Sequence, residues 1–114
     1  MVAYELITGV PDMFYTLSAL TEILLVERAD ALHLHPGEKL VIEITRNLTE
    51  LSGPPLESHD IEKLLRQLAS GEQFREFQSS RIVSCYHQVH GKGWFNILAF
   101  RQQGQVRLEI RAVN

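Results

Sequence analysis

Residues 26–44, VERADALHLHPGEKLVIEI, mark the point where a helical pattern of apolar residues gives way to an alternating one. Leu32 and Leu34 fall on one side of an extended segment, and the residues between and around them fall on the other. The pair Pro36–Gly37 then predicts a turn, after which the β-branched run of residues 40–44 predicts a second strand. The stretch therefore indicates a helix that leads into the first two strands of a sheet.

Two regions precede this stretch. Residues 1–11 contain a short apolar run and predict either an edge strand or a loosely held arm. From Asp12, a candidate N-cap, apolar residues recur at spacings of three and four as far as Arg28. This spacing predicts an amphipathic helix over residues 12–28, and its apolar face should lie on a sheet.

The middle of the chain predicts turns and then two helices. Arg46 to Thr49 are turn-forming residues, and Glu50–Leu51 predict a brief return to extended pairing. The prolines within residues 52–55 exclude regular structure, because each lacks a backbone donor. Apolar spacing predicts a helix that follows Ser58, a candidate N-cap, and ends at Ser70–Gly71, and then a shorter helix over residues 72–78.

Three apolar runs occupy the last third of the chain. Residues 90–93 and 102–105 separate them, and glycine in each separator permits the positive φ that tight turns require. Within residues 106–112 apolar and polar side chains alternate, so one face of that strand should be exposed to water. The pattern predicts a meander of three antiparallel strands.

Together these elements predict an α+β fold. The expected architecture is a single antiparallel or mixed sheet with helices packed on one face, in a PAS-like arrangement. At 114 residues the chain has room for one domain with one core. We therefore expect residues 1–114 to form a single domain, with residues 12–113 as its helix and sheet unit.

Composition excludes several classes of protein. The single cysteine, Cys85, cannot form an internal disulfide, so a reducing cytoplasm is the expected location. The formal net charge of -3 gives no reason to expect nucleic acid as a partner. No apolar run approaches the eighteen or so residues that a membrane span needs, so direct membrane insertion is not expected.

The histidines and the cysteine invite hypotheses about metals and nucleophiles. His33 and His35 lie on one strand face, while His87 and His90 lie near a turn, but no carboxylate or cysteine has recognisable ligand spacing. We therefore predict no metal site and interpret His33 as a hydrogen-bonding residue of its strand. Cys85 shares a strand face with His87, yet no orienting group is visible, so Cys85 is predicted to be a core residue.

Two surfaces are candidates for binding. Trp94, Phe95 and Tyr86 could line a small-ligand pocket, or such aromatic residues could fill the core under the helices. Three arginines near the final hairpins, together with Lys92, define a basic surface; they are Arg101, Arg107 and Arg111. This surface is either simply solvated or a contact for a carboxylate-rich partner or a phosphate, for which arginine geometry is suited.

Several motifs in this order match one known family. The matching residues are Leu24 to Leu34 with Pro36–Gly37, Pro54 to Leu56, Glu72 to Phe77, Ala99–Phe100 and Arg111. Over residues 24–113 the chain resembles the N-terminal, PAS-like domain of type IV pilus retraction ATPases, which are relatives of the type II secretion ATPases. The resemblance implies a cytoplasmic domain that contacts an ATPase core or homologous subunits.

The sequence departs from the family pattern at three points. The family's aspartate before the first strand leucine falls at Ala31, with Asp30 one place early. Trp94 to Asn96 replace an arginine-phenylalanine-arginine run, whose arginines can approach phosphates in a neighbouring subunit of relatives; only Arg111 of that hairpin matches. No GxxxxGK[ST] loop occurs, so this chain lacks the phosphate cradle of a P-loop enzyme.

These observations favour a non-catalytic interaction module that forms a homo-oligomer or a hetero-complex and needs no cofactor. The chain is expected either to be part of a longer ATPase or to stand alone as a relative of one. The alternative is a PAS-like sensor that binds a small ligand in the aromatic pocket described above.

Overall fold

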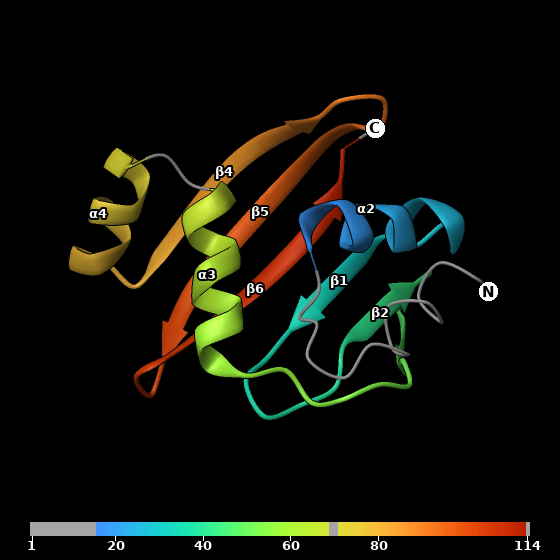
Figure 1. The fold of residues 1–114 in the computed structure, drawn as a ribbon, viewed down its shortest axis with the longest axis horizontal. Helices are drawn as coiled ribbons and strands as arrows, with labels where there is room; N and C mark the ends of the chain where they lie inside the picture. Colours follow the sequence, from blue (N-terminus) through green and yellow to red (C-terminus); the bar gives the residue numbers. More distant parts are fainter. Residues whose placement is uncertain (1–15, 69–70, 114) are drawn as a thin grey trace.

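Six antiparallel strands form one continuous sheet in the computed structural model of the chain (Figure 1). The strands are β1 (Ala31–Leu34), β2 (Val41–Ile44), β3 (Asn47–Glu50), β4 (Ile82–Val89), β5 (Gly93–Gln102) and β6 (Gln105–Ala112). Their order in the sheet is β3-β2-β1-β6-β5-β4. The structure describes residues 16–68 and 71–113, so the predicted arm over residues 1–11 and the candidate cap Asp12 lie outside the described residues.

The centre of the sheet is the pairing of the first strand with the last one. Leu32 lies opposite Ile110, and Leu34 lies opposite Leu108, so the two segments are antiparallel. All four side chains are buried. This pairing joins the hairpin that follows residue 30 to the three-strand meander, and of the two predicted sheet types the antiparallel one is confirmed.

Within residues 16–68 and 71–113, three helices pack against the sheet, and Figure 1 shows α2 and α3 over the same face of it. They are α2 (Leu17–Val26), α3 (Ser58–Leu68) and α4 (Gly71–Ser79). In α3 the spacing of Ile61, Leu64 and Leu65 places a buried stripe toward the sheet, as predicted. No helix within residues 16–68 and 71–113 is long and apolar enough to cross a membrane.

Helix α2 is shorter than the predicted helix over residues 12–28. It begins after Thr16, whose side chain accepts a hydrogen bond from the backbone N–H of Ala19 at 3.1 Å. A threonine that caps in this way satisfies a backbone donor that the first turn leaves unpaired. The helix ends at Val26, because the next residues turn the backbone away.

The end of α2 places a non-glycine residue in the left-handed region. The N–H of Ala29 donates to the carbonyl of Leu24, the N–H of Arg28 donates to the carbonyl of Leu25, and Arg28 has a φ of 53°. This is a Schellman motif, in which glycine usually occupies the left-handed position. Arg28 therefore accepts a conformational cost that glycine would avoid.

We expect Arg28→Gly to raise the free energy of unfolding by about 1 kcal/mol, because glycine adopts a left-handed φ without steric cost. Urea denaturation of the two proteins measures the difference. Arg28→Ala is the matched control, since it removes the same side chain and keeps the steric cost. Equal stability of the glycine and alanine variants would show that φ at this position is not strained.

The second hairpin was only partly predicted. Residues 46–49 were expected to form a turn, but Asn47 already belongs to β3 and pairs with Ile44. The turn consists of Thr45 and Arg46 alone, with φ values of 49° and 70°. Two-residue turns of this kind usually contain asparagine or glycine, so the sequence lacked the signal that reveals them.

Candidate functional site

One face of the sheet carries the core, and the helices α2 and α3 lie over that same face (Figure 1). Side chains of alternate strand residues such as Val83, Phe95 and Ile97 are buried against the helices. We call the opposite surface the open face and define it by the strand residues that point away from the helices. They are Ala31, His33, Val41, Glu43, Leu48, Glu50, Ile82, Ser84, Tyr86, Gln88, Trp94, Asn96, Leu98, Phe100, Gln102, Gln105, Arg107, Glu109 and Arg111.

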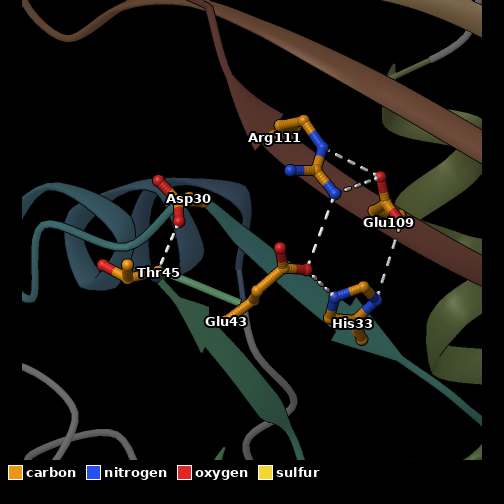
Figure 2. Close-up of polar contacts among 6 residues, drawn as sticks. All are labelled: Asp30, His33, Glu43, Thr45, Glu109 and Arg111. Carbon is orange, nitrogen blue, oxygen red and sulfur yellow. Dashed lines mark hydrogen bonds and ion pairs between the residues drawn. The ribbon is translucent and has the colours of Figure 1, made fainter. Parts of the chain in front are cut away.

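Charged residues from β2, β1 and β6 form a network on the open face (Figure 2). His33 Nε2 lies 2.9 Å from Glu43 Oε1, and His33 Nδ1 lies 3.7 Å from Glu109 Oε1. Arg111 Nη2 lies 3.0 Å from Glu109 Oε2 and 3.6 Å from Glu43 Oε1. The predicted hydrogen-bonding role of His33 is confirmed.

Arg111 is the residue on which this network converges. Burial lowers the pKa of its guanidinium, but the hydrogen bond and charge of Glu109, followed by the charges of Glu43 and Asp30, outweigh burial and raise the pKa above its ordinary value. Arg111 therefore remains positively charged between the two glutamates. The carboxylate of Asp30 also accepts a hydrogen bond from the backbone N–H of Thr45 at 2.8 Å (Figure 2).

His35 lies next to this network, and its ring centre is 6.3 Å from that of His33. Burial lowers the pKa of His35, and the charges of Arg107 and His33 lower it further. Glu38, whose Oε1 lies 3.8 Å from His35 Nδ1, acts in the opposite direction and raises this pKa. The folded state therefore favours neutral His35 more than the unfolded chain does.

This shift predicts a pH dependence of stability. Because the pKa of His35 is lower in the folded state, its contribution to stability is present above the ordinary pKa of 6.5 and is lost as the pH falls through the folded value. We expect the unfolding free energy of wild type to decrease on acidification more steeply than that of His35→Gln. Urea titrations at about one pH unit above and below the ordinary pKa measure both slopes. Parallel slopes would contradict the assignment.

Exposed aromatic and aliphatic side chains from β4 and β5 form the other half of the open face. Tyr86 is 65% exposed, Trp94 is 50% exposed and Ile82 is 56% exposed. Phe95, by contrast, is only 1% exposed, because adjacent residues of a strand point to opposite faces. The structure therefore separates Phe95, in the core, from Trp94 and Tyr86, and the three predicted pocket residues do not line one cavity.

The predicted basic surface is also divided between the two faces. Arg107 and Arg111 lie on the open face, but Arg101 lies on the helix side with its guanidinium carbon 4.9 Å from the centre of the Phe77 ring. Lys92 is also engaged on the helix side, where its Nζ donates to the carbonyl of Ser18 at 3.0 Å. Only two of the three predicted arginines are therefore placed to act together.

The remaining histidines and the cysteine form no reactive group. Within residues 16–68 and 71–113, no cluster of three or more histidine, cysteine, aspartate or glutamate residues has the arrangement of a metal site. Cys85 and His87 belong to the helix side of β4, whereas His33 and His35 belong to the open face. Cys85 is 4% exposed and burial raises the pKa of its thiol, so it is a core residue, as predicted.

A hollow of about 530 Å³ lies where the end of α2 meets the end of β6. Its lining residues are Leu24, Leu25, Arg28, Ala29, Asp30, Arg111 and Ala112. Arg28, whose φ is positive, lines this hollow together with Asp30 and Arg111. Arg111 was predicted as a site residue, whereas Glu43 and Glu109 were not, because only the strand register shows that they meet Arg111. Arg28 was also not predicted, because only the fold brings the end of α2 beside Arg111.

Comparisons with known proteins support the predicted resemblance at the level of the fold. No known protein family matches the sequence, and no curated protein does. The crystal structure of the pilus retraction motor PilT with bound ADP matches over 89% of this chain, with a TM-score of 0.81 and 22% identity. The ATPase DotB of Legionella pneumophila matches over 88% of it, with a TM-score of 0.73 and 12% identity. The DotB ATPase of Yersinia pseudotuberculosis matches over 91%, with a TM-score of 0.64 and 17% identity.

The matched region is a minor part of each of these ATPases. This chain covers 30% of the PilT chain, 30% of the Legionella DotB chain and 32% of the Yersinia DotB chain. The chain therefore has the fold of a part of PilT and of the two DotB ATPases, in agreement with the resemblance that the sequence motifs indicate.

Proposed function

We propose that the chain is a non-catalytic docking module that binds an ATPase core, or a homologous subunit, through its open face. The observation that supports this most is the open face itself, which joins a charge network to exposed aromatic side chains on a fold shared with part of PilT. In this proposal residues 1–114 act as one PAS-like domain in the cytoplasm.

The composition of the open face suits a protein partner. Tryptophan, tyrosine and arginine are the residues that contribute most to binding energy at protein interfaces. Trp94, Tyr86 and Arg111 provide all three types on one surface. The charged half is already paired internally, so a partner that covers it would bury few unpaired charges.

The proposed mechanism is mechanical and not chemical. This sequence has no GxxxxGK[ST] loop, so it lacks the phosphate cradle that a P-loop enzyme uses. When the ATPase core changes conformation, the sheet would move with it as a rigid body and pass that motion to the next subunit. Arg111 and Arg107 are the proposed contact residues of this interface, and Arg101 is left out because it packs on Phe77.

The small-ligand sensor is the weaker proposal. It depended on a pocket lined jointly by Trp94, Phe95 and Tyr86, and these side chains point to opposite faces of the sheet. A sensor function would therefore require a different binding site from the one that the sequence predicted.

Isothermal titration tests the docking proposal. The chain is titrated into the purified ATPase core of a pilus retraction or DotB-type ATPase from the organism that encodes it. We expect saturable binding, and we expect Arg111→Met to weaken it by about tenfold, which corresponds to about 1.4 kcal/mol. Arg75→Met on α4 is the matched control, because it removes the same charge from the helix side and should leave binding unchanged.

Two results would overturn the proposal. One is the absence of binding by wild type to every such ATPase core that the organism encodes. The other is equal weakening by Arg111→Met and Arg75→Met, because that would show that general charge and not the open face determines association.

A further inference from the structure

The edge strand β4 has the properties of a strand that pairs with another molecule. It is eight residues long, from Ile82 to Val89, and it forms one end of the sheet. Exposed edge strands are usually protected by proline, by charged side chains, by a bulge or by shortness. The sequence IVSCYHQV contains no proline and no lysine, arginine, aspartate or glutamate, and its eight residues pair with β5 without interruption. The other edge, β3, is only four residues long.

The backbone groups that β4 directs outward can be identified from its register. The N–H of Arg101 donates to the carbonyl of Arg81 at 2.8 Å, so the odd-numbered residues of this strand direct their backbone groups toward β5. Because these groups alternate along an antiparallel strand, residues 82, 84, 86 and 88 direct theirs away from the sheet.

Three of these outward residues are available for pairing. The carbonyl of Ile82 already accepts a hydrogen bond from the Ser80 hydroxyl at 3.2 Å, and α4 lies beside the beginning of the strand (Figure 1). Among the described residues, no hydrogen bond from outside the sheet reaches the outward backbone groups of Ser84, Tyr86 or Gln88. The second half of β4 is therefore the accessible part of the edge.

We infer that a second copy of this chain occupies the edge, with the two β4 strands antiparallel around a two-fold axis at Tyr86. In this register Tyr86 faces Tyr86 of the second copy, Ser84 faces Gln88 of the second copy, and Gln88 faces Ser84 of the second copy. Each of these three pairs exchanges two backbone hydrogen bonds, about six in all. The arrangement uses the three available residues and leaves Ile82 and α4 outside the pairing.

The side chains of β4 are compatible with this self-pairing. No charged residue lies between Ile82 and Val89, so the pairing places no like charges opposite one another. On the helix side the same register sets Val83 opposite Val89 and Cys85 opposite His87. On the open face it sets the exposed Tyr86 of one copy opposite that of the other, and aromatic pairs across strands stabilise sheets. A two-fold interface that pairs identical patches also closes on itself and does not propagate into fibres.

The oligomeric state of the isolated chain tests this inference without any ATPase, so its failure would leave the docking proposal unaffected. We expect light scattering to give the mass of a dimer for wild type. Tyr86→Lys should halve that mass, because the two lysines would face each other at the axis. Trp94→Lys is the matched control: it makes a similar change on the same face one strand away and should remain a dimer.

Disulfide trapping provides a second measurement that does not depend on disrupting the fold. The two Cα atoms of a hydrogen-bonded pair are about 5.5 Å apart, which a disulfide can bridge, so Tyr86→Cys should form a covalent dimer on mild oxidation. Trp94→Cys should not, because its copies would be three strand spacings apart, ~14 Å across the strands, and would also be offset along them. Wild type should not either, since Cys85 is buried.

Three results would overturn the inference. A wild-type chain that remains monomeric at its highest soluble concentration would exclude the second copy as the occupant. A dimer that Tyr86→Lys leaves intact would place the interface elsewhere. Equally fast cross-linking of Tyr86→Cys and Trp94→Cys would indicate random collision instead of a defined register.

Discussion

We expect Phe77→Ala to lower the free energy of unfolding by about 3–5 kcal/mol. Phe77 is fully buried and is the residue that α4 buries in the core. Removing the ring would leave a cavity under a short helix and would also remove the surface on which the Arg101 guanidinium stacks at 4.9 Å.

The matched control is Phe74→Ala in the same helix. Phe74 is only half-buried and packs at the edge of the core, where Arg66 lies 5.0 Å from the centre of its ring. We expect this variant to lose less than half as much stability as Phe77→Ala, measured by urea denaturation monitored by circular dichroism. Equal losses at the two positions would show that α4 is fixed to the sheet along its whole length and not through one side chain.

Strand and helix types were predictable because they depend on local pattern. Leu32 and Leu34 alternate with polar neighbours, and both are buried in the centre of the sheet. The same reasoning placed the stripe of α3 and the closing meander correctly. Local pattern could not give the turn at Thr45 and Arg46, because neither residue signals the left-handed conformation that it adopts.

The candidate site was less predictable because it depends on register. Glu43, His33 and Glu109 belong to three different strands and meet only because β1 pairs with both β2 and β6. A single-residue shift in either pairing would move one of these side chains to the other face. The incorrect grouping of Arg101 with Arg111 has the same origin. Arg101 pairs with Val106, which points to the helix side, whereas Arg111 pairs with Asn96, which points to the open face.

The alternation of side chains along β5 places two adjacent aromatic residues on opposite faces of the sheet. Trp94 and Phe95 are adjacent in sequence, yet Phe95 is 1% exposed and Trp94 is 50% exposed. Burial of Phe95 is explained by the core that it fills. Trp94 and Tyr86 are exposed next to each other and do not contribute to the core. We attribute their exposure to the proposed interfaces.

The second large effect is therefore expected in binding, and it rests on the proposed docking function. We expect Trp94→Ala to weaken association with the ATPase core by about 30-fold, which corresponds to a loss of about 2 kcal/mol, because tryptophan is the residue type most enriched among dominant interface contacts. The same substitution should change the unfolding free energy by less than about 0.5 kcal/mol, since the side chain is half exposed and lies outside the core.

Val26→Ala on α2 is the control, because Val26 is also exposed, at 43%, but belongs to the helix side. It should leave the affinity for the ATPase core unchanged. Isothermal titration and urea denaturation of the same preparations measure binding and stability together. If Trp94→Ala lowered the unfolding free energy as much as Phe77→Ala and left the affinity for the ATPase core unchanged, the Trp94 ring would stabilise the sheet and would not contribute to docking. The open face would then lose the residue on which its proposed role in docking chiefly depends.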